Sequence, residues 1–388
     1  MEMRKKKDEI SKVIVFGPGM VNTLGMIRSL GEKGLCVHVI MSTVDRKKNY
    51  VGYCKYINKA YYIKDIKEIL RILHDEYWNE PKRIAILCGG DAEISLLDQY
   101  YEELKQRFLV FNCGEEGKLN SFLNKINQFP IAEAAGLTLI KTWVINTIEN
   151  VPNDIKFPCL TKGSNSSEST KGDMHICHSY GELKAHLKKG TKYLVQEFIK
   201  KEYELNFVCI AYNNGNNVFV PCVIRKIRDD IGRQSAYFRT DAISNYPDFD
   251  KQVLYRIASQ LHYEGIFSVE VIYSQGHYYF LEINLRNDGC GYLYTKAGCN
   301  YPFLWAKYAS KELSSQETDS INVKIPCSMM SEQDLKNLFQ NRVCFLTWIK
   351  QFLFADTFYI LSLRDPLPFI FSTLSHIKQA FKNIAQRI

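Results

Sequence analysis

The residues best suited to chemistry lie in one predicted β-hairpin. Two runs rich in β-branched and aromatic residues, 266–273 and 277–284, flank a turn of residues 274–276 in which Gly276 supplies a positive φ. Side chains alternate along a strand, so the second run and the residues after it divide into two faces: Glu282, Asn284 and Arg286 on one, and Leu281, Ile283 and Leu285 on the other. The sequence therefore predicts an apolar face toward a core and a charged face toward a ligand or solvent.

The charged face has the composition of a site for a hard cation. If Tyr273 opposes His277 across the turn, Glu270 lies diagonally next to Glu282, at roughly 7 Å. Two carboxylates and the Asn284 amide oxygen form an all-oxygen ligand set, and Mg²⁺ held in this way usually serves a nucleotide phosphate. A shift of one residue would move Glu270 to the opposite face, so the prediction depends on the register.

The alternative is that this face is the solvated side of an ordinary hairpin. Against that alternative, Glu270 interrupts the apolar run F-S-V-E-V-I, where an unpaired carboxylate is costly to bury. A ligand-binding role is therefore favoured.

Composition and charge narrow the class of protein. The 388 residues are 46% hydrophobic and 24% charged, which predicts two or three ordered domains with a sizeable core. The net charge of +8 suits an anionic small molecule or a membrane surface as well as nucleic acid. No nucleic-acid-binding signature accompanies it, so no nucleic-acid partner is expected. Motifs of serine hydrolases, zinc proteases and Walker-type nucleotide sites are also missing from the sequence.

The cysteines and the N-terminus predict where the protein resides. Twelve cysteines are scattered without a C-x-x-C spacing, mostly within apolar runs, as buried free thiols are. This usage indicates a reducing cytosol and no metal–thiolate site. The first residues lack the apolar core of a signal peptide, so we expect the protein to stay in the cytoplasm.

The first 115 residues have the pattern of a compact α/β unit. A Gly17-Pro18-Gly19 turn separates an apolar strand from a helix, as in doubly wound sheets, where such a turn often meets a phosphate. Asn22 replaces the third glycine of the dinucleotide-binding fingerprint, so a structural turn is favoured over dinucleotide binding. Asp91 is expected to cap a later helix. The expected strands are 12–16, 35–41, 83–87 and 108–111, and the expected helices are 21–30, 66–74 and 91–97.

The middle of the chain contains two lysines next to elements that could hold phosphate. Lys125 lies in a helix expected over 119–136, and Lys162 ends a strand over 157–162. A polar loop, 163–172, follows Lys162, and such a loop can fold over phosphates or be an ordinary flexible connection. The basic stretch 225–239, with Lys226, Arg228 and Arg233, is expected to be a loop that either recognises an acidic substrate or is solvated. Further elements are expected over 180–187 and 251–263 (helices) and over 193–199, 205–211 and 218–224 (strands).

The residues after about 315 differ in composition from the rest. Residues 345–363 are apolar and aromatic but contain Lys350 and Asp356, which is too polar for a clean membrane span. Residues 366–368 are expected to break the chain before a short basic amphipathic helix with Lys378, Lys382 and Arg387. A helix packed on the protein is the simpler interpretation, and docking on an anionic membrane surface is the alternative.

Several spaced motifs together resemble the ATP-grasp superfamily, nearest to its carboxylate-amine ligases and carbamoyl-phosphate-synthetase-like members. The motifs occur in the order of that family over residues 12–310: K-I-N-Q-F at Lys125, F-P-C-L-T-K ending at Lys162, Q-E-F-I with Glu204 seven residues after Glu197, and V-E-V with L-E-I-N-L-R. The resemblance implies an ATP-grasp fold with α/β and α+β parts. A Rossmann-like pre-ATP-grasp domain (1–115) precedes the ATP-grasp domain (116–312), whose two subdomains meet near 196–200, and a helical extension (313–388) follows.

The resemblance also implies a role for each matching residue. Lys125, Lys162 and Lys171 would bind the nucleotide phosphates, Glu197 with the Phe198 and Ile199 backbone would bind the adenine, and Glu204 the ribose. Glu270, Glu282 and Asn284 would hold two Mg²⁺ ions, with Mn²⁺ as an alternative metal. Arg286, with Lys162, would be catalytic by stabilising the transferring phosphate. The chain departs from the family in a glycine-poor loop at 163–172 and in Leu285, where a proline is frequent.

The implied activity is an ATP-dependent ligase. A substrate carboxylate would attack the γ-phosphate of ATP, and an amine would then attack the acyl phosphate to form an amide or peptide bond. Cell-wall or polysaccharide precursors are candidate substrates, and a homodimer and a peripheral contact of the C-terminal tail with the inner face of the membrane are further expectations. The alternative is a nucleotide-binding protein without ligase activity that docks on a membrane or partner through this tail. A dinucleotide-dependent oxidoreductase built on residues 17–19 is the weakest hypothesis.

Overall fold

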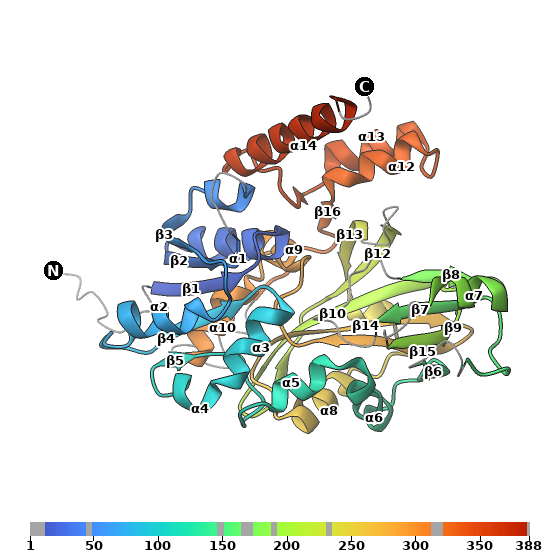
Figure 1. The fold of residues 1–388 in the computed structure, drawn as a ribbon, viewed down its shortest axis with the longest axis horizontal. Helices are drawn as coiled ribbons and strands as arrows, with labels where there is room; N and C mark the ends of the chain where they lie inside the picture. Colours follow the sequence, from blue (N-terminus) through green and yellow to red (C-terminus); the bar gives the residue numbers. More distant parts are fainter. Residues whose placement is uncertain are drawn as a thin grey trace.

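A computed structural model describes residues 12–43, 49–145, 151–163, 174–187, 192–229, 235–311 and 321–385, with side chains described up to residue 378. Its first part is a parallel sheet in the strand order β3-β2-β1-β4-β5, flanked by helices (Figure 1). These elements are β1 Lys12–Gly17, α1 Val21–Gly31, β2 Cys36–Met41, η2 Tyr50–Tyr53, β3 Ile57–Tyr62, α2 Glu68–Tyr77, β4 Ile84–Cys88, α3 Asp91–Gln99, α4 Tyr101–Leu104 and β5 Phe108–Leu109. The sequence predicted every strand of this sheet except β3.

Two short helices lead out of this sheet where one was expected. α5 (Lys118–Leu123) ends at Asn124, whose side chain caps α6 (Lys125–Ala135) by accepting a hydrogen bond from the Ile126 N–H. The extended backbone at Asn124 breaks the helix predicted over 119–136. As a result, Lys125 is the first residue of α6.

A four-stranded antiparallel sheet follows, in the order β6-β9-β7-β8. It consists of β6 Thr142–Ile145, β7 Cys159–Gly163, β8 His175–Cys177 and β9 Tyr193–Glu197, with α7 Tyr180–His186 packed beside it. This sheet has a small core of its own around Cys159, Cys177, Leu183 and Val195. Lys162 is thus held on a strand of a separate small unit, shown in green in Figure 1.

The largest sheet has eight strands and receives strands from two distant parts of the chain. Its order is β15-β14-β10-β12-β13-β16-β17, with β11 beside β10. The strands are β10 Tyr203–Tyr212, β11 Asn217–Phe219, β12 Val223–Asp229, β13 Ser235–Asp241, β14 Gly265–Ser274, β15 His277–Asn284, β16 Ser328–Met330 and β17 Thr357–Phe358. The loop predicted over 225–239 is wrong, because most of it forms β12 and β13.

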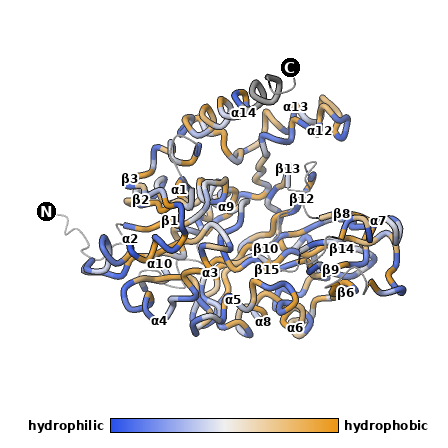
Figure 2. Tube along the Cα trace, in the orientation of Figure 1, coloured by the Kyte–Doolittle hydropathy of each residue, from blue (hydrophilic) through white to orange (hydrophobic). Residues whose placement is uncertain are grey.

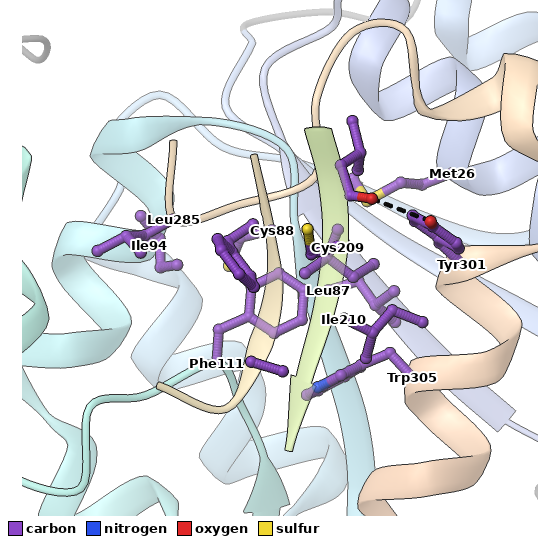
Figure 3. Packing of buried hydrophobic residues seen from close by; sticks show 14 of the residues in the cluster. Met26, Leu87, Cys88, Ile94, Phe111, Cys209, Ile210, Leu285, Tyr301 and Trp305 are labelled. Carbon is purple, nitrogen blue, oxygen red and sulfur yellow. Dashed lines mark hydrogen bonds between the residues drawn. The ribbon is translucent and has the colours of Figure 1, made fainter. Parts of the chain in front are cut away.

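Helices join this sheet to the N-terminal one. Figure 3 shows the shared core, in which Phe111 and Trp305 meet edge to face with ring centroids 4.5 Å apart, and the buried Tyr301 hydroxyl donates to the Val208 carbonyl. The helices of this region are η5 Ile243–Asn245, α8 Gln252–Leu261, α9 Gly291–Lys296 and α10 Tyr301–Ala309. One large core therefore holds the two sheets in a fixed relation.

The C-terminal segment returns to the start of the chain. It contains η6 Glu332–Asp334, α12 Leu335–Phe339, α13 Phe345–Phe354 and α14 Leu367–Ala385, which Figure 1 shows in red on one side of the molecule. α14 begins at Leu367, so the chain break predicted at 366–368 is replaced by a helix start. Arg28 of α1 donates to Asp365 at 2.9 Å with both side chains buried, which attaches the segment to the N-terminal sheet.

All twelve cysteines lie in the described part of the chain. Each has a free thiol, and ten of them are buried. The prediction that most of the cysteines are buried free thiols is confirmed.

Candidate active site

The β14–β15 hairpin places Glu270 directly opposite Glu282. Its turn has two residues, Gln275 and Gly276, with φ of 48° and 82°, so Ser274 pairs with His277. The predicted pairing of Tyr273 with His277 is therefore wrong by one residue.

A β-bulge at Leu281 compensates for this shift. The pairing passes from Val271↔Phe280 to Glu270↔Glu282, so that Leu281 is the extra residue of β15. Without it, Glu282 would face the core. Leu281 was predicted on the apolar face with Ile283 and Leu285, but it lines a cleft instead.

The arrangement of Glu270, Glu282 and Asn284 fits a hard cation. The Asn284 amide nitrogen lies 3.3 Å from Glu270 Oε1 and 3.5 Å from Glu282 Oε1, and an amide flip would present its oxygen at the same place. Like charges directly opposite each other destabilise a hairpin, so a divalent cation between the two carboxylates would relieve the repulsion.

No cluster of three or more His, Cys, Asp or Glu side chains in the described residues is placed to hold a metal ion. A site with only two carboxylates suits an ion whose other ligands are phosphate and water.

Lys125 and Lys162 reach this face from two different elements. Lys125 Nζ lies 2.9 Å from Glu282 Oε2, and this carboxylate raises the pKa of Lys125. Lys162, on β7, donates to the Leu281 carbonyl at 3.4 Å. Burial, with Lys125 nearby, lowers the pKa of Lys162 to about 8. The two cations line the same cleft near each other, as expected of phosphate ligands.

Arg286 is held by a residue that the sequence did not identify as part of the site. Its Nε donates to Asp91 Oδ1 at 2.5 Å. Although burial opposes the charge, Asp91 raises the pKa of Arg286, which keeps the guanidinium protonated. Asp91 is the first residue of α3, and the position before the helix is Gly90, so the prediction that Asp91 caps this helix is wrong.

Glu204 lies between two lysines on the same sheet face. Its carboxylate is 2.6 Å from Lys201 Nζ and 2.7 Å from Lys226 Nζ. Although burial opposes the charge, Glu204 and Asp229 raise the pKa of Lys226. Lys226 thus belongs to the site through β12, whereas Arg228 turns to Asp334, with its Nε 2.8 Å from Oδ1. Arg233 lies outside the described residues.

The residues expected to bind adenine line the same cleft. Glu197, Phe198 and Ile199 follow one another where β9 ends. The Phe198 N–H donates to the Pro158 carbonyl at 3.2 Å, so a base contact from Phe198 would need its carbonyl oxygen. Lys171 and most of the loop 163–172 lie outside the described residues.

Two adjoining cavities meet at these side chains. A cleft of about 520 Å³ contains all the predicted nucleotide and metal residues that the structure describes, and a second cavity of about 700 Å³ lies beside it. Five residues line both: Asp91, Glu204, Lys226, Glu270 and Arg286. The second cavity is enclosed by the turn 18–22, by the large sheet, and by α12 and α14 of the C-terminal segment. This second cavity was not predicted from the sequence, because the turn 18–22 and the C-terminal helices that line it lie more than 300 residues apart.

Asn22, the second residue of α1, supports the residues after β15 that include Arg286. Asn22 donates to the Gly89 carbonyl at 2.8 Å and to the Asn287 carbonyl at 2.6 Å, and the Asn287 side chain donates back to Asn22 Oδ1 at 2.6 Å. Asn22, which departs from the dinucleotide fingerprint, therefore joins the N-terminal sheet to the residue after Arg286.

Comparisons with known proteins identify the fold of the chain. A sequence model of the ATP-grasp domain matches residues 131–302. The chain is 20% identical over 354 residues to the carbamoyl phosphate synthase large chain of Methanothrix thermoacetophila; the match covers 81% of this chain and 30% of that protein. The chain thus spans under a third of that relative's length.

Two solved structures have the same fold. An N5-carboxyaminoimidazole ribonucleotide synthetase in complex with ADP aligns with a TM-score of 0.66 at 15% identity, over 88% of this chain and 87% of that one. An L-amino acid ligase from Bacillus licheniformis aligns with a TM-score of 0.65 at 16% identity, over 82% and 79%. The expected fold class, an ATP-grasp fold preceded by a Rossmann-like domain and followed by a helical region, is confirmed.

Proposed function

We propose, from the premise that this chain contains an ATP-grasp domain, that it is a ligase that activates a substrate carboxylate with ATP and joins it to an amine. The observation that carries the proposal is that Lys125, Lys162 and Glu282 line the same cleft as Glu270 and Arg286, and that Glu270 and Arg286 also line the second cavity. Phosphate ligands in the cleft, with an arginine and a metal-binding carboxylate on the wall that it shares with the second cavity, suit the transfer of a phosphoryl group from a molecule in one to a molecule in the other.

In this proposal ATP occupies the 520 Å³ cleft. Its adenine lies by Glu197, Phe198 and Ile199, its ribose by Glu204, and its phosphates by Lys125 and Lys162. Glu270, Glu282 and Asn284 would hold two Mg²⁺ ions, which when bound neutralise the phosphate charge. The homologue with ADP bound supports the nucleotide assignment. Lys171 is proposed as a further phosphate ligand.

The reaction requires no nucleophile from the protein. A substrate carboxylate oxygen attacks the γ-phosphorus, and the bond to the β–γ bridging oxygen breaks to release ADP. The amine nitrogen then attacks the acyl carbon, phosphate leaves, and the amine loses a proton. Arg286 lies between the two cavities and stabilises the negative charge on the transferring group, since Asp91 holds its guanidinium in place.

The carboxylate and the amine would occupy the 700 Å³ cavity. Its wall combines Arg286 and Lys226 with aromatic side chains, among them Phe238, Phe339 and Tyr359. A cell-wall or polysaccharide precursor with an acidic group fits this combination. A homodimer is a further proposal, which sedimentation velocity would test.

The test is ADP release by the purified protein with Mg²⁺ and ATP, across single amino acids, sugar acids and amine pairs. One pair should stimulate release, and Glu282→Ala should reduce it at least about a hundredfold, because the variant loses a group that acts on the transition state. Glu103→Ala is the matched control, since Glu103 is exposed and outside both cavities. If no substrate pair stimulates release although ATP still binds with Mg²⁺, the ligase proposal fails.

That outcome would favour the second candidate, a nucleotide-binding protein that docks on a membrane or partner through its C-terminal tail. The exposed apolar side chains of α13 and α14 are the observation in its favour. Retention of both carboxylates and Arg286 favours the ligase, because a site that only binds nucleotide has no need of a group at the entrance to the second cavity.

A further inference from the structure

The C-terminal segment concentrates the exposed apolar surface of the molecule. Sixteen large apolar side chains of the described residues are exposed, and eleven of them lie within residues 335–377. We name these eleven the outer face: Leu335, Phe339, Phe345, Leu346, Leu353, Phe354, Leu363, Leu367, Ile370, Leu374 and Ile377. The other five are dispersed among residues 20–325. A concentration of exposed apolar side chains on one part of a protein marks a binding surface, whereas isolated side chains do not.

The outer face is separate from the face that holds the segment on the protein. On α14, Leu367, Ile370, Leu374 and Ile377 recur every three or four residues and so share one side of the helix. The opposite side faces the second cavity, which Phe369, Ser372 and His376 line. At the edge of the exposed row, the Phe371 ring stacks on Tyr53 with centroids 3.4 Å apart.

The same division holds on α13. Trp348 is buried while Leu346, Leu353 and Phe354 are more than 60% exposed. Figure 2 shows hydrophobic residues along these outer helices as well as in the core. The fold does not need these side chains for its own packing.

The charge around the outer face is positive. Within residues 335–378, five basic side chains are exposed: Lys336, Arg342, Lys350, Arg364 and Lys378. The same range has two acidic residues, and both have partners: Asp365 is buried against Arg28, and Asp356 pairs with Lys324. A second copy of the chain on this face would bring like charges together, whereas an anionic surface would complement them.

We infer that the outer face, with its basic side chains, binds an anionic lipid bilayer. Apolar side chains enter the headgroup region while lysine and arginine contact the phosphates, which is how amphipathic helices lie at an interface. None of the described helices is long and apolar enough to cross a membrane, so the contact is a peripheral one.

The outer face lies next to the second cavity. Leu335 and Phe339 of α12 belong to both, and α14 presents Phe369, Ser372 and His376 to the cavity from its other side. A bilayer under α12 and α14 would therefore lie next to the cavity wall. This last step rests on the proposed function, whereas lipid binding itself does not.

The experiment is co-sedimentation of the full chain with vesicles. Vesicles of phosphatidylcholine with about 30% phosphatidylglycerol have a strongly negative surface and should bind the protein. Vesicles of phosphatidylcholine alone should bind it at least about tenfold more weakly, and salt should weaken the binding to anionic vesicles.

Variants separate this surface from a general effect of charge. Leu346→Glu with Leu374→Glu should reduce binding to anionic vesicles at least about tenfold, because both carboxylates would enter the headgroup region. Val144→Glu is the matched control: Val144 is 43% exposed, lies on β6 and should leave binding unchanged. ATP binding and circular dichroism should be the same in all three proteins, which verifies their folding.

Three results would overturn the inference: equal binding to both vesicle types, an equal loss in Val144→Glu, or no vesicle binding together with a dimer that Leu374→Glu dissociates. The last would make the outer face an interface between two copies. Failure of vesicle binding leaves ADP release in solution untouched, so the two proposals fail independently.

Discussion

Two arginines of this protein each pair with an aspartate far away in the sequence, and their surroundings give them different roles. Arg28 donates to Asp365 at 2.9 Å, with 0% and 1% of the side chains exposed. Arg286 donates to Asp91 at 2.5 Å, with 19% and 15% exposed, and both line the two cavities. The first pair is closed to any ligand and fixes the C-terminal segment, whereas the second is open to a substrate. Access to a cavity, more than the identity of the charged groups, distinguishes a structural pair from a functional one.

The largest effect should come from Asp365→Asn. It leaves the Arg28 charge buried without a counter-ion, which costs about 3–5 kcal/mol of the free energy of unfolding. The matched change, Asp91→Asn, should cost less of the free energy of unfolding, because solvent reaches both groups, but it should impair ADP release. Urea denaturation of both variants measures the difference. Equal destabilisation would show that burial does not separate the two pairs.

Arg286→Lys should come next, with an effect on rate and little on stability. A lysine keeps the charge but loses the planar guanidinium that contacts Asp91 and the phosphoryl group together, so we expect ADP release to fall about 10²–10³-fold. Arg256→Lys, on the exposed surface of α8 and paired with Asp250, is the control and should be neutral. A rate within threefold of the wild type would remove Arg286 from its proposed role.

The smallest effect concerns pH and Lys162, whose pKa of about 8 lies well below its ordinary value. As pH rises through this value the free protein loses a phosphate-binding charge, so ATP affinity should fall roughly tenfold between pH 7 and 9. Lys162→Arg stays charged and should show a flat profile. Between about pH 8 and pH 10.5, Lys162 is mostly neutral in the folded state but protonated in the unfolded state. The free energy of unfolding should therefore rise with pH in that window. Parallel affinity profiles for wild type and variant would contradict the assignment.

The sequence was sufficient to identify the site residues whose type is unusual among their neighbours in the chain. Glu270 within an apolar strand and Lys162 at a strand end pointed to the site, and all the predicted site residues that the structure describes line one cleft. The hairpin register was not predictable, because the two-residue turn places Gln275 at positive φ, where a non-glycine residue is uncommon. The Leu281 bulge also leaves no mark in the pattern of hydrophobic residues.

Partners at long range were beyond sequence reasoning. Asp91 lies 195 residues before Arg286, and as the first residue of a helix it resembles an ordinary cap. β16 and β17 have two or three residues each and come from a stretch of mixed composition, so only their pairing with β13 and with each other identifies them as strands. The enclosure of the second cavity by α12 and α14 likewise follows from tertiary packing alone.

The Arg28–Asp365 pair also has a consequence for folding during synthesis. Arg28 emerges from the ribosome early, but the aspartate that neutralises it is synthesised 337 residues later. Domains fold N-terminal first during synthesis, so the first sheet must hold an uncompensated guanidinium at the surface of α1 until Asp365 has been synthesised. A chain that stops before residue 365 would leave the Arg28 charge exposed to water on the face of α1 that the C-terminal segment covers. Docking of the C-terminal segment should therefore follow the folding of the first sheet, and it depends on synthesis past residue 365.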